Sequence, residues 1–434
     1  MPGGNGQALP DPSYDGIPAV SAGSPVGAAG GRILALDMLR GFALVCIMLD
    51  HMPIGVARNA TISNFFLFDA AELFVLLSGF LVGLVWRQVA ARDGTGAAQR
   101  RFAIRAFQVW RAMMVAAVLM ALLSLGLQAL DLTHTAVWNG YAEMLATQPL
   151  QYLLAVGSLW MQPNLLDVLA LYALVLAFVP LVLPGIMRWP LLTAAVLFAV
   201  WWYAVPLNNL LPNERPGARG LLFNPFGWQA LFFTGAALGV YRTAVMARLR
   251  PIAPLVTLLA VCTLIFGALV LIGWRVGQPL QPLRDALFAV HGVIDKWPMD
   301  GARYLSILAA AWLVAAPLAG LFGWLAGTGP GRALATIGRG GLVSFVACVL
   351  LSVLGDAGQN AIVPAAAARL LVDLWTIPAL WVIAEVLARW DARPSRTALP
   401  VRVRGATPVP APRLELRHQP AQGPRQGRGP GQLA

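Results

Sequence analysis

Hydrophobic residues along the chain are grouped in ten long runs, which are separated by shorter polar links. A run of roughly 20 residues is the length that an α-helix needs to cross the hydrocarbon core of a bilayer. The pattern therefore predicts an all-α protein, a polytopic membrane helix bundle of about ten transmembrane helices. The runs lie near residues 33–50, 68–87, 103–128, 165–184, 190–206, 225–243, 252–274, 303–326, 335–354 and 366–389.

Two segments outside these runs show no hydrophobic periodicity. Residues 1–31 are rich in Gly, Pro, Ala and Ser, and residues 391–434 are rich in Pro, Gly, Arg and Gln. Segments of such composition bury too little apolar surface to offset the entropy lost on folding. We expect a disordered N-terminus over 1–31, a transmembrane domain over 32–390 and a disordered basic tail over 391–434.

Composition agrees with a membrane protein. The chain is 58% hydrophobic and only 12% charged, whereas soluble domains carry about 25% charged residues. The net charge of +12 comes from arginines in the links and the tail. Membrane topology and anionic lipid explain that charge. We therefore expect membrane lipid as a partner and no nucleic acid.

The distribution of arginines orients the bundle. The link between the second and third runs contains six arginines between residues 87 and 111 and one acid, Asp93, and further arginines fall in alternate links. The link at 129–163 contains Asp131 and Glu143 but no arginine. Because basic links stay on the cytoplasmic side, both termini are expected in the cytoplasm. His51 is then expected near the outer surface.

The first run carries the strongest candidate site. Eleven positions at about 100° each come to about 20° past three full turns, so Arg40 and His51 share one face of a helix. Asp37, three positions before Arg40, joins that face. An arginine within the membrane is costly and usually has a function. The structural alternative is an interfacial Asp37–Arg40 ion pair with His51 at a helix end.

Three carboxylates lie close to this face in the sequence. A carboxylate beside an imidazole raises its basicity and fixes its tautomer, which suits a general base. Asp50 and Glu72 are both candidates for that partner of His51. Asp69 and Glu72 are three positions apart on one helix face. If Ser63 or Asn64 caps that helix, the two acids merely complement its dipole.

Other polar residues open later helices. Arg105 and Arg111 suit phosphate groups of a cytosolic co-substrate, although they equally suit topology signals at the interface. Asn164 and Asp167 are substrate-binding candidates that also fit a helix cap, with Asn164 as N-cap and Asp167 at the third helical position.

Two more candidates open the sixth run. An indole face packs well on the C–H faces of a sugar, so Trp228, with Gln229, suits a sugar site. A belt of interfacial aromatic residues explains Trp228 equally well. No metal-binding constellation is apparent in the sequence.

Six segments resemble one family of membrane enzymes. They are LALDMLRGFALVCIMLDHMP, FDAAELFVLLSGFLVGLVW, IRAFQVWRAMM, QPNLLDVLALY, FNPFGWQALFFTGAALG and IGRGGLVSFV, and they span roughly residues 33–390 in order. With these segments the chain resembles the OpgC family, a branch of the acyltransferase-3 superfamily. Arg40 and His51, separated by ten residues, match the motif of that family.

The resemblance implies O-acyl transfer from cytosolic acyl-CoA to an extracytoplasmic glycan. For OpgC-like proteins it implies succinyl-CoA as donor, succinylation of an osmoregulated periplasmic glucan, and a place in the bacterial inner membrane. By the matching motif, His51 is the general base and Arg40 a donor-site residue. The acceptor hydroxyl would arrive from outside and attack the thioester directly, without an acyl-enzyme.

Two other classes of function use similar residues. An ion-coupled transporter also places Asp, Arg and His inside the membrane, but it predicts solute exchange without acyl-CoA. A membrane-embedded binding or assembly protein predicts that replacing His51 has no effect. The sequence leaves the oligomeric state open, including a homodimer.

Overall fold

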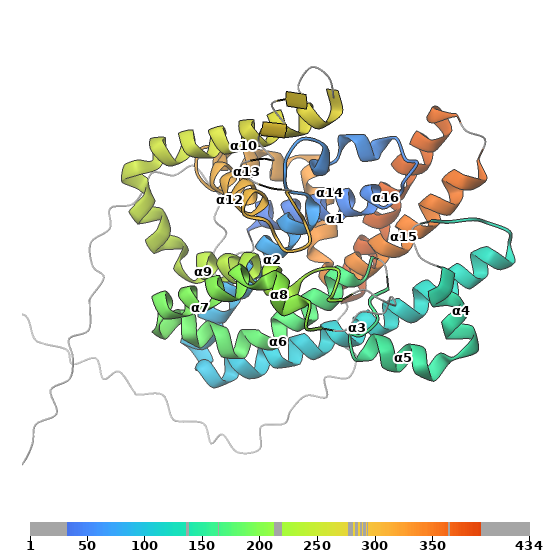
Figure 1. Ribbon diagram of the computed structural model, residues 1–434, viewed down its shortest axis with the longest axis horizontal. Coiled ribbons are helices and arrows are strands. Elements are labelled where there is room, and N and C mark those ends of the chain that lie inside the picture. The colour runs from blue at the N-terminus through green and yellow to red at the C-terminus, as the bar shows by residue number, and fades with distance from the viewer. Residues whose placement is uncertain are drawn as a thin grey trace, which may run out of the picture. The chain divides into compact units, whose positions relative to one another are not determined.

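The computed structural model describes residues 33–135, 139–163, 165–211, 219–276, 281–282, 285–286, 289, 292, 294–362 and 365–391. The predicted disordered termini lie outside these residues. The described part of the chain is all-helical, as predicted (Figure 1). Its α-helices are α1 (Leu34–Asp50), α2 (Ala70–Asp93), α3 (Thr95–Ala129), α4 (Asn139–Thr147), α5 (Pro149–Gly157), α6 (Asp167–Arg188), α7 (Pro190–Trp202), α8 (Ala204–Asn208), α9 (Pro225–Leu249), α10 (Ala253–Val276), α12 (Gly301–Ala315), α13 (Ala319–Gly327), α14 (Gly329–Arg339), α15 (Gly341–Ala361) and α16 (Ala366–Asp391). Short 3₁₀ helices are η1 (Ala57–Ala60), η2 (Ile62–Asn64) and η3 (Arg250–Ile252).

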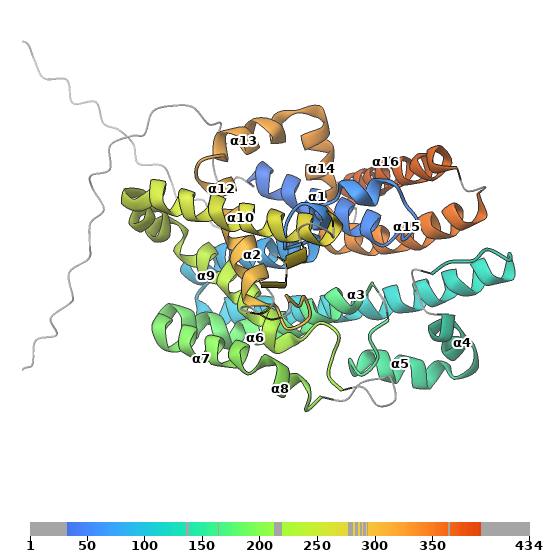
Figure 2. The same ribbon diagram turned by 45° about the horizontal axis from the view of Figure 1, so that its top comes forward.

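The number of membrane spans differs from the predicted ten. Among the described residues, six helices are long and apolar enough to cross a membrane, or seven if the bent pair α12 and α13 forms one span. That pair is bent by 73°. The segment Pro225–Trp274 counts once among the six, although it contains both α9 and α10. The chain turns between these two helices (Figures 1 and 2).

Two predicted runs have different boundaries in the structure. The run at 190–206 is divided between α7, which has only 13 residues, and the short α8. The run at 335–354 crosses the junction of α14 and α15, where Gly341 has a positive φ of 55°. Hydrophobicity is continuous across the first break, so the hydrophobic pattern alone does not reveal it. The second break falls in the segment Gly-Arg-Gly-Gly at 338–341, which the predicted run had included.

Reciprocal glycines bring α2 and α9 into backbone contact. A Cβ atom on Gly79 or Gly83 of α2 would collide with the backbone of α9 at Phe232 and Ala236. The same is true in the opposite direction, because a Cβ on Gly235 or Gly239 would collide with the backbone of α2. Two glycines spaced by four therefore face two others, the small-residue arrangement that lets membrane helices pack closely. In the sequence, the small residues Gly79 and Gly83 already favour close helix packing at this position, and the structure confirms that packing.

Helix α1 is held in the same way on its other sides. Gly41 of α1 and Gly338 of α14 each lie against the backbone of the partner helix. On α15, the Cys348 thiol and the Ser352 hydroxyl donate to the carbonyls of Leu44 and Met48, over 3.3 and 3.2 Å. These contacts with α14 and α15 place helix α1 in the interior and fix the position of its end at His51.

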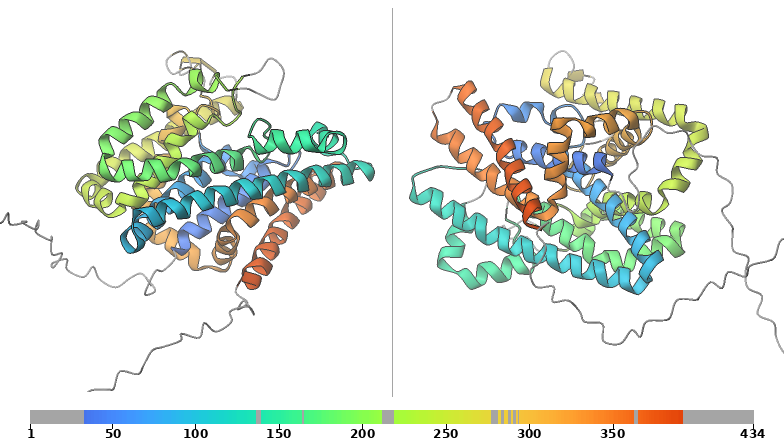
Figure 3. Two further views of the ribbon diagram at one scale, coloured as in Figure 1. Left: turned by 90° about the horizontal axis from the view of Figure 1, so that it is seen from below. Right: turned by 180° about the vertical axis from the view of Figure 1, so that it is seen from behind.

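Helix α3 runs alongside α6 (Figure 3).

A methyl group at Gly79 is expected to destabilise the fold. Alanine is the better helix former by about 1 kcal/mol, but the backbone of α9 leaves no space for a Cβ, and overpacking costs about 1–3 kcal/mol. Gly79→Ala should lower the thermal unfolding midpoint in detergent. Gly126→Ala is the matched control, because no atom lies within 4 Å of a Cβ there. Equal midpoints for the two variants would contradict this packing.

Candidate functional site

His51 immediately follows α1, and a backbone carbonyl holds its ring. The Nδ1 atom lies 2.7 Å from the carbonyl oxygen of Ile47. Because a carbonyl only accepts hydrogen bonds, Nδ1 carries the proton in this pair. Among the described residues, no other hydrogen bond reaches the ring. In the neutral imidazole the lone pair is then on Nε2, which is left as the basic nitrogen of the ring.

The surroundings of His51 favour its neutral form. Burial lowers the pKa of His51, and the positive charges of Lys296 and Arg58 lower it further, against the opposing influence of the Ile47 carbonyl and Asp69. A buried imidazole with a lowered pKa is unprotonated near neutral pH. The site therefore keeps His51 ready to accept a proton.

Neither predicted carboxylate is hydrogen-bonded to His51. Asp50 accepts hydrogen bonds from the hydroxyls of Thr61 and Ser63, over 2.5 and 3.3 Å. Neighbouring residues on a helix face different directions, and Asp50 is turned toward the link that follows α1. Glu72 has other partners, described below. The structure replaces both candidates for orienting the ring with the Ile47 carbonyl.

The link after His51 is fastened by a residue far away in the sequence. One carboxylate oxygen of Asp373 in α16 accepts from the backbone N–H groups of Val56 and Ala57, over 2.7 and 2.8 Å. Gln359 of α15 donates to the other oxygen over 2.5 Å. Asp373 is fully buried. It thus fixes the chain that leaves the His51 position, a role that its isolated place in an apolar run did not reveal.

Asp69 and Glu72 form a capping box at the start of α2. The Asp69 side chain accepts from the backbone N–H of Ala71 over 2.8 Å, and Glu72 accepts from the N–H of Asp69 over 3.1 Å. Asp69 is therefore the N-cap, and the alternative caps Ser63 and Asn64 are excluded. The two carboxylates satisfy backbone donors that have no partner within the helix.

Two cations pair with the same carboxylates. Lys296 Nζ lies 2.6 Å from Asp69, and Arg303 Nε donates to Glu72 over 2.7 Å. Glu72 is fully buried, and Arg303 also approaches Asp69, at 3.5 Å. Two buried acids and two cations thus form an ion cluster (Asp69, Glu72, Lys296 and Arg303) at the end of the bundle where α1 ends and α2 begins.

Both cations were missed in the sequence. Lys296 is the only lysine in the chain and is followed by Trp297. This single lysine among thirty arginines was the one feature of the sequence that could have indicated a special role. Its ammonium group lies 5.4 Å from the ring centre of Phe223 and 5.5 Å from that of Trp297. Burial lowers the pKa of Lys296, but Asp69 and Glu72 outweigh it and raise the pKa overall. Burial likewise raises the pKa of Asp69, yet Lys296 and Arg303 hold it well below its ordinary value.

Arg40 lies deeper in the bundle among aromatic rings. Its guanidinium is 5.7 Å from the ring centre of Phe74, which in turn lies 6.4 Å from Tyr172. The charges of Arg40 and Arg105 both act on the Tyr172 hydroxyl. Arg105 also donates to Gln108 over 3.2 Å. The structure therefore brings Arg105 of α3 into the surroundings of Arg40.

Other predicted residues are arranged differently. Asp37 is buried, whereas Arg111 is exposed on α3. Asn164 lies outside the described residues. Asp167 is the first residue of α6, whose N-cap is Leu166, so the predicted place at the third helical position is wrong.

Trp228 and Gln229 are not available to a sugar in this structure. Trp228 has no exposed surface, and its indole N–H donates to the Trp297 carbonyl over 3.1 Å. Gln229 is 8% exposed and donates to the Leu197 carbonyl over 2.9 Å. Both side chains hold the start of α9, which Asn224 caps by accepting from the N–H of Phe226 over 3.0 Å. Their predicted sugar-binding role stays a prediction.

We expect Arg303→Met to destabilise the protein strongly. The substitution leaves Glu72 buried without its cation, and breaking a buried ion pair costs about 3–5 kcal/mol. The double variant Glu72→Gln, Arg303→Met should recover part of the loss, as measured by thermal unfolding in detergent. The control is Arg389→Met, whose partner Glu385 lies 3.0 Å away on the surface and whose loss costs about 0.5 kcal/mol. Equal midpoints for Arg303→Met and Arg389→Met would refute the stabilising role of the cluster.

The comparisons with known proteins agree with this architecture. A family model described as OpgC protein matches residues 32–392. No curated protein matches the chain. The matched residues include His51, Arg40, all four members of the ion cluster, and Asp373. The match confirms the resemblance drawn from the six sequence segments, and it implies a multi-pass membrane enzyme of the general acyltransferase type. Because the match covers most of its residues, the chain belongs to the OpgC protein family.

Proposed function

We propose that the protein moves an acyl group, a succinyl group in the first instance, from cytosolic acyl-CoA to a hydroxyl of a periplasmic glucan. The observation that supports this most directly is the state of His51. Its Nδ1 is occupied by the Ile47 carbonyl, and its pKa is lowered by burial. A neutral imidazole with a fixed tautomer is what general-base catalysis of an acyl transfer needs.

The proposed reaction takes place in one transfer step. His51 Nε2 accepts the proton of the glucan hydroxyl while the hydroxyl oxygen attacks the thioester carbonyl. The tetrahedral intermediate expels the thiolate of coenzyme A, which then recovers the proton from the imidazolium. The new bond is an ester, and the broken bond is the thioester. Positive charge from Lys296, which acts on His51, favours the negative charge on the former carbonyl oxygen.

Arg40 and Arg105 are the proposed donor-side residues. On ideal helix geometry Arg40 lies about 16 Å along α1 from His51. Arg105 comes from the basic link between the second and third runs and acts on the same tyrosine as Arg40. Guanidinium groups bind phosphate and carboxylate oxygens well. An extended acyl-CoA arm entering from the cytoplasm would then pass Arg40 and present its thioester near His51.

This assignment includes an orientation. The basic links support placing both termini in the cytoplasm and the His51 end on the periplasmic side of the bacterial inner membrane. Donor and acceptor then approach from opposite sides and meet within the bundle, so the acyl group crosses the membrane while coenzyme A remains on the cytoplasmic side.

His51→Ala is expected to abolish most of the activity. Loss of a general base lowers the rate about 10²–10⁴-fold. The measurement is transfer of labelled acyl groups from acyl-CoA to periplasmic glucan in proteoliposomes, read by mass spectrometry. His418→Ala, in the basic tail, is the matched control and should transfer at the wild-type rate. Wild-type transfer by His51→Ala would refute the mechanism, and solute exchange without acyl-CoA would favour the transporter.

The rate is also expected to depend on pH through His51. The base is active when unprotonated, so the rate falls as the pH decreases through its pKa. Because burial lowers that pKa below the ordinary value of about 6.5, the acid limb of kcat/KM should lie below pH 6.5. The measurement varies the pH on the acceptor side of proteoliposomes while the donor side stays buffered. An acid limb above the ordinary histidine range would contradict the neutral, buried imidazole.

A further inference from the structure

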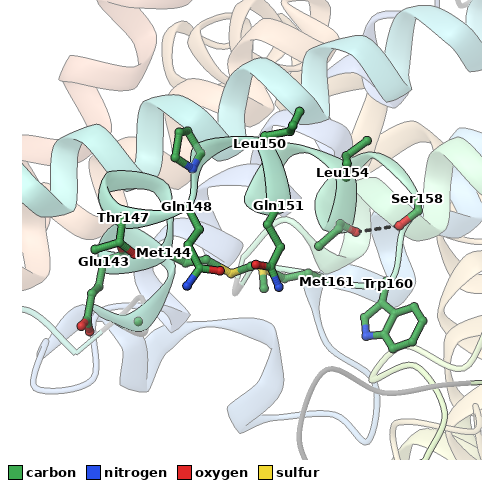
Figure 4. A pocket seen from close by; sticks show the side chains of 13 residues that line it. Glu143, Met144, Thr147, Gln148, Leu150, Gln151, Leu154, Ser158, Trp160 and Met161 are labelled. Carbon is green, nitrogen blue, oxygen red and sulfur yellow. Dashed lines mark hydrogen bonds between the residues drawn. The ribbon is translucent and has the colours of Figure 1, made fainter.

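A groove on α4 and α5 is not used by the proposed reaction. It has a volume of about 1240 Å³ and is bounded by the two short helices and the segment that follows α5. Figure 4 shows Gln148 and Gln151 extending side by side from one side of the helices, with Met144 and Met161 between them. Leu150 and Leu154 point the opposite way in that view. The two glutamines thus extend from the opposite side of the segment to the two leucines.

The groove is a preformed part of the fold. Tyr152 of α5 is fully buried and donates to the Ala117 carbonyl of α3 over 3.0 Å. Trp110 of α3 donates to the carbonyl of Gly157 over 2.9 Å. After α5 the chain reverses at Leu159, whose φ is 62°. Helix α5 is therefore anchored to α3, against which α4 also packs, and the residues after Leu159 return along the groove.

The Thr147 and Ser158 hydroxyls of the groove donate to backbone carbonyls of their own helices, over 2.9 and 3.1 Å, but four other polar side chains have no partner within the described structure. Gln148, Gln151 and Glu143 are exposed, and among the described residues their side chains make no hydrogen bond or ion pair. Trp160 is 53% exposed, and its indole N–H is likewise without a partner there. Two amides, a carboxylate and an indole are thus free to bind a ligand at one place.

The chemistry of the groove fits a neutral, hydroxyl-rich chain. Amide groups both donate to hydroxyls and accept from them, and an ionised carboxylate accepts from them. An indole ring offers a flat apolar face together with a polar N–H, which suits the C–H face of a pyranose ring. No basic residue is among the lining residues that the structure describes, so the groove does not favour phosphate or another anion.

The position of the groove connects it with His51. Helix α1 ends at His51, α2 runs back through the bundle, and α3 returns to the same end. Helices α4 and α5 follow α3 directly, so they lie at the His51 end of the bundle. A polymeric acceptor extends over more of this end of the bundle than a single sugar does.

We propose that the α4–α5 groove is a docking site for the acceptor glycan at a distance from the reacting hydroxyl. This inference rests on the proposed function, because it names the part of the same substrate that does not react. Docking there raises the local concentration of hydroxyls near His51. Docking in the groove therefore lowers the KM for long glycans and leaves the chemical step at His51 unchanged.

The test measures binding and kinetics of the full chain in lipid nanodiscs. The variants are Trp160→Ala and the double variant Gln148→Ala, Gln151→Ala, all at exposed positions. The matched control is Trp189→Ala, because Trp189 is 57% exposed but lies outside the groove. It follows the C-terminal end of α6, whereas the groove segment precedes the N-terminal end of that helix. The probes are a long neutral glucose oligomer and glucose itself, with calorimetry for binding and acyl transfer for KM and kcat.

We expect both groove variants to raise Kd and KM for the long oligomer about tenfold, which corresponds to about 1.4 kcal/mol. The kcat, and the KM for glucose, should stay unchanged, and Trp160→Phe should restore most of the affinity. Identical affinities for Trp160→Ala and Trp189→Ala would overturn the proposal. Loss of phospholipid binding in place of glycan binding would also overturn it, because the groove would then be a lipid site.

His51→Ala separates the two proposals. If the groove binds the acceptor, His51→Ala binds the oligomer with wild-type affinity although it transfers nothing. If the wild-type protein transfers no acyl group but binds the oligomer through Trp160, the proposed function fails and the groove stands. If transfer depends on His51 but KM is the same in every groove variant, the groove fails and the proposed function stands.

Discussion

The backbone contact between α2 and α9 is the constraint on which the site depends. Glycines on both helices remove the side chains that would hold the backbones apart. The start of α9 then lies next to the segment at 294–300, because the Trp297 carbonyl accepts from the N–H of Asn224 and from the indole of Trp228. Lys296 of that segment reaches Asp69 at the start of α2. Close packing in the interior thus determines which charges meet at the His51 end.

The ion cluster shows how the fold accommodates buried charge. A carboxylate as buried as that of Glu72 is costly unless it is paired and hydrogen-bonded. Here one carboxylate oxygen accepts from a backbone N–H and the other from Arg303. The first backbone N–H groups of α2 require hydrogen-bond acceptors, and Lys296 and Arg303 require anionic partners. The carboxylates of Asp69 and Glu72 meet both requirements. This shared use explains why Asp69 and Glu72 are unavailable to orient His51.

The position of His51 is set largely by the backbone. The ring is held by a carbonyl one turn earlier in its own helix, and the chain beyond it is fixed by Asp373 of α16. A backbone partner fixes the tautomer without adding a negative charge beside the ring. The imidazole consequently remains neutral and basic, whereas a carboxylate partner would have favoured the imidazolium. The same arrangement leaves Asp50 to order the following link through Thr61 and Ser63.

The sequence by itself determined the helical class and the family, because these depend on local composition, periodicity and motifs. It also indicated the close packing at Gly79 and Gly83. It did not determine the number of spans, since hydrophobicity is continuous across the α7–α8 break and an apolar run by itself does not show whether its helix crosses the membrane. Only the tertiary structure assigned partners to the polar groups. Lys296, Arg303 and Asp373 reach the site from more than two hundred residues away in the chain, and Trp228 is buried by a segment that follows it. Such contacts depend on which helices lie side by side, and no local pattern encodes that.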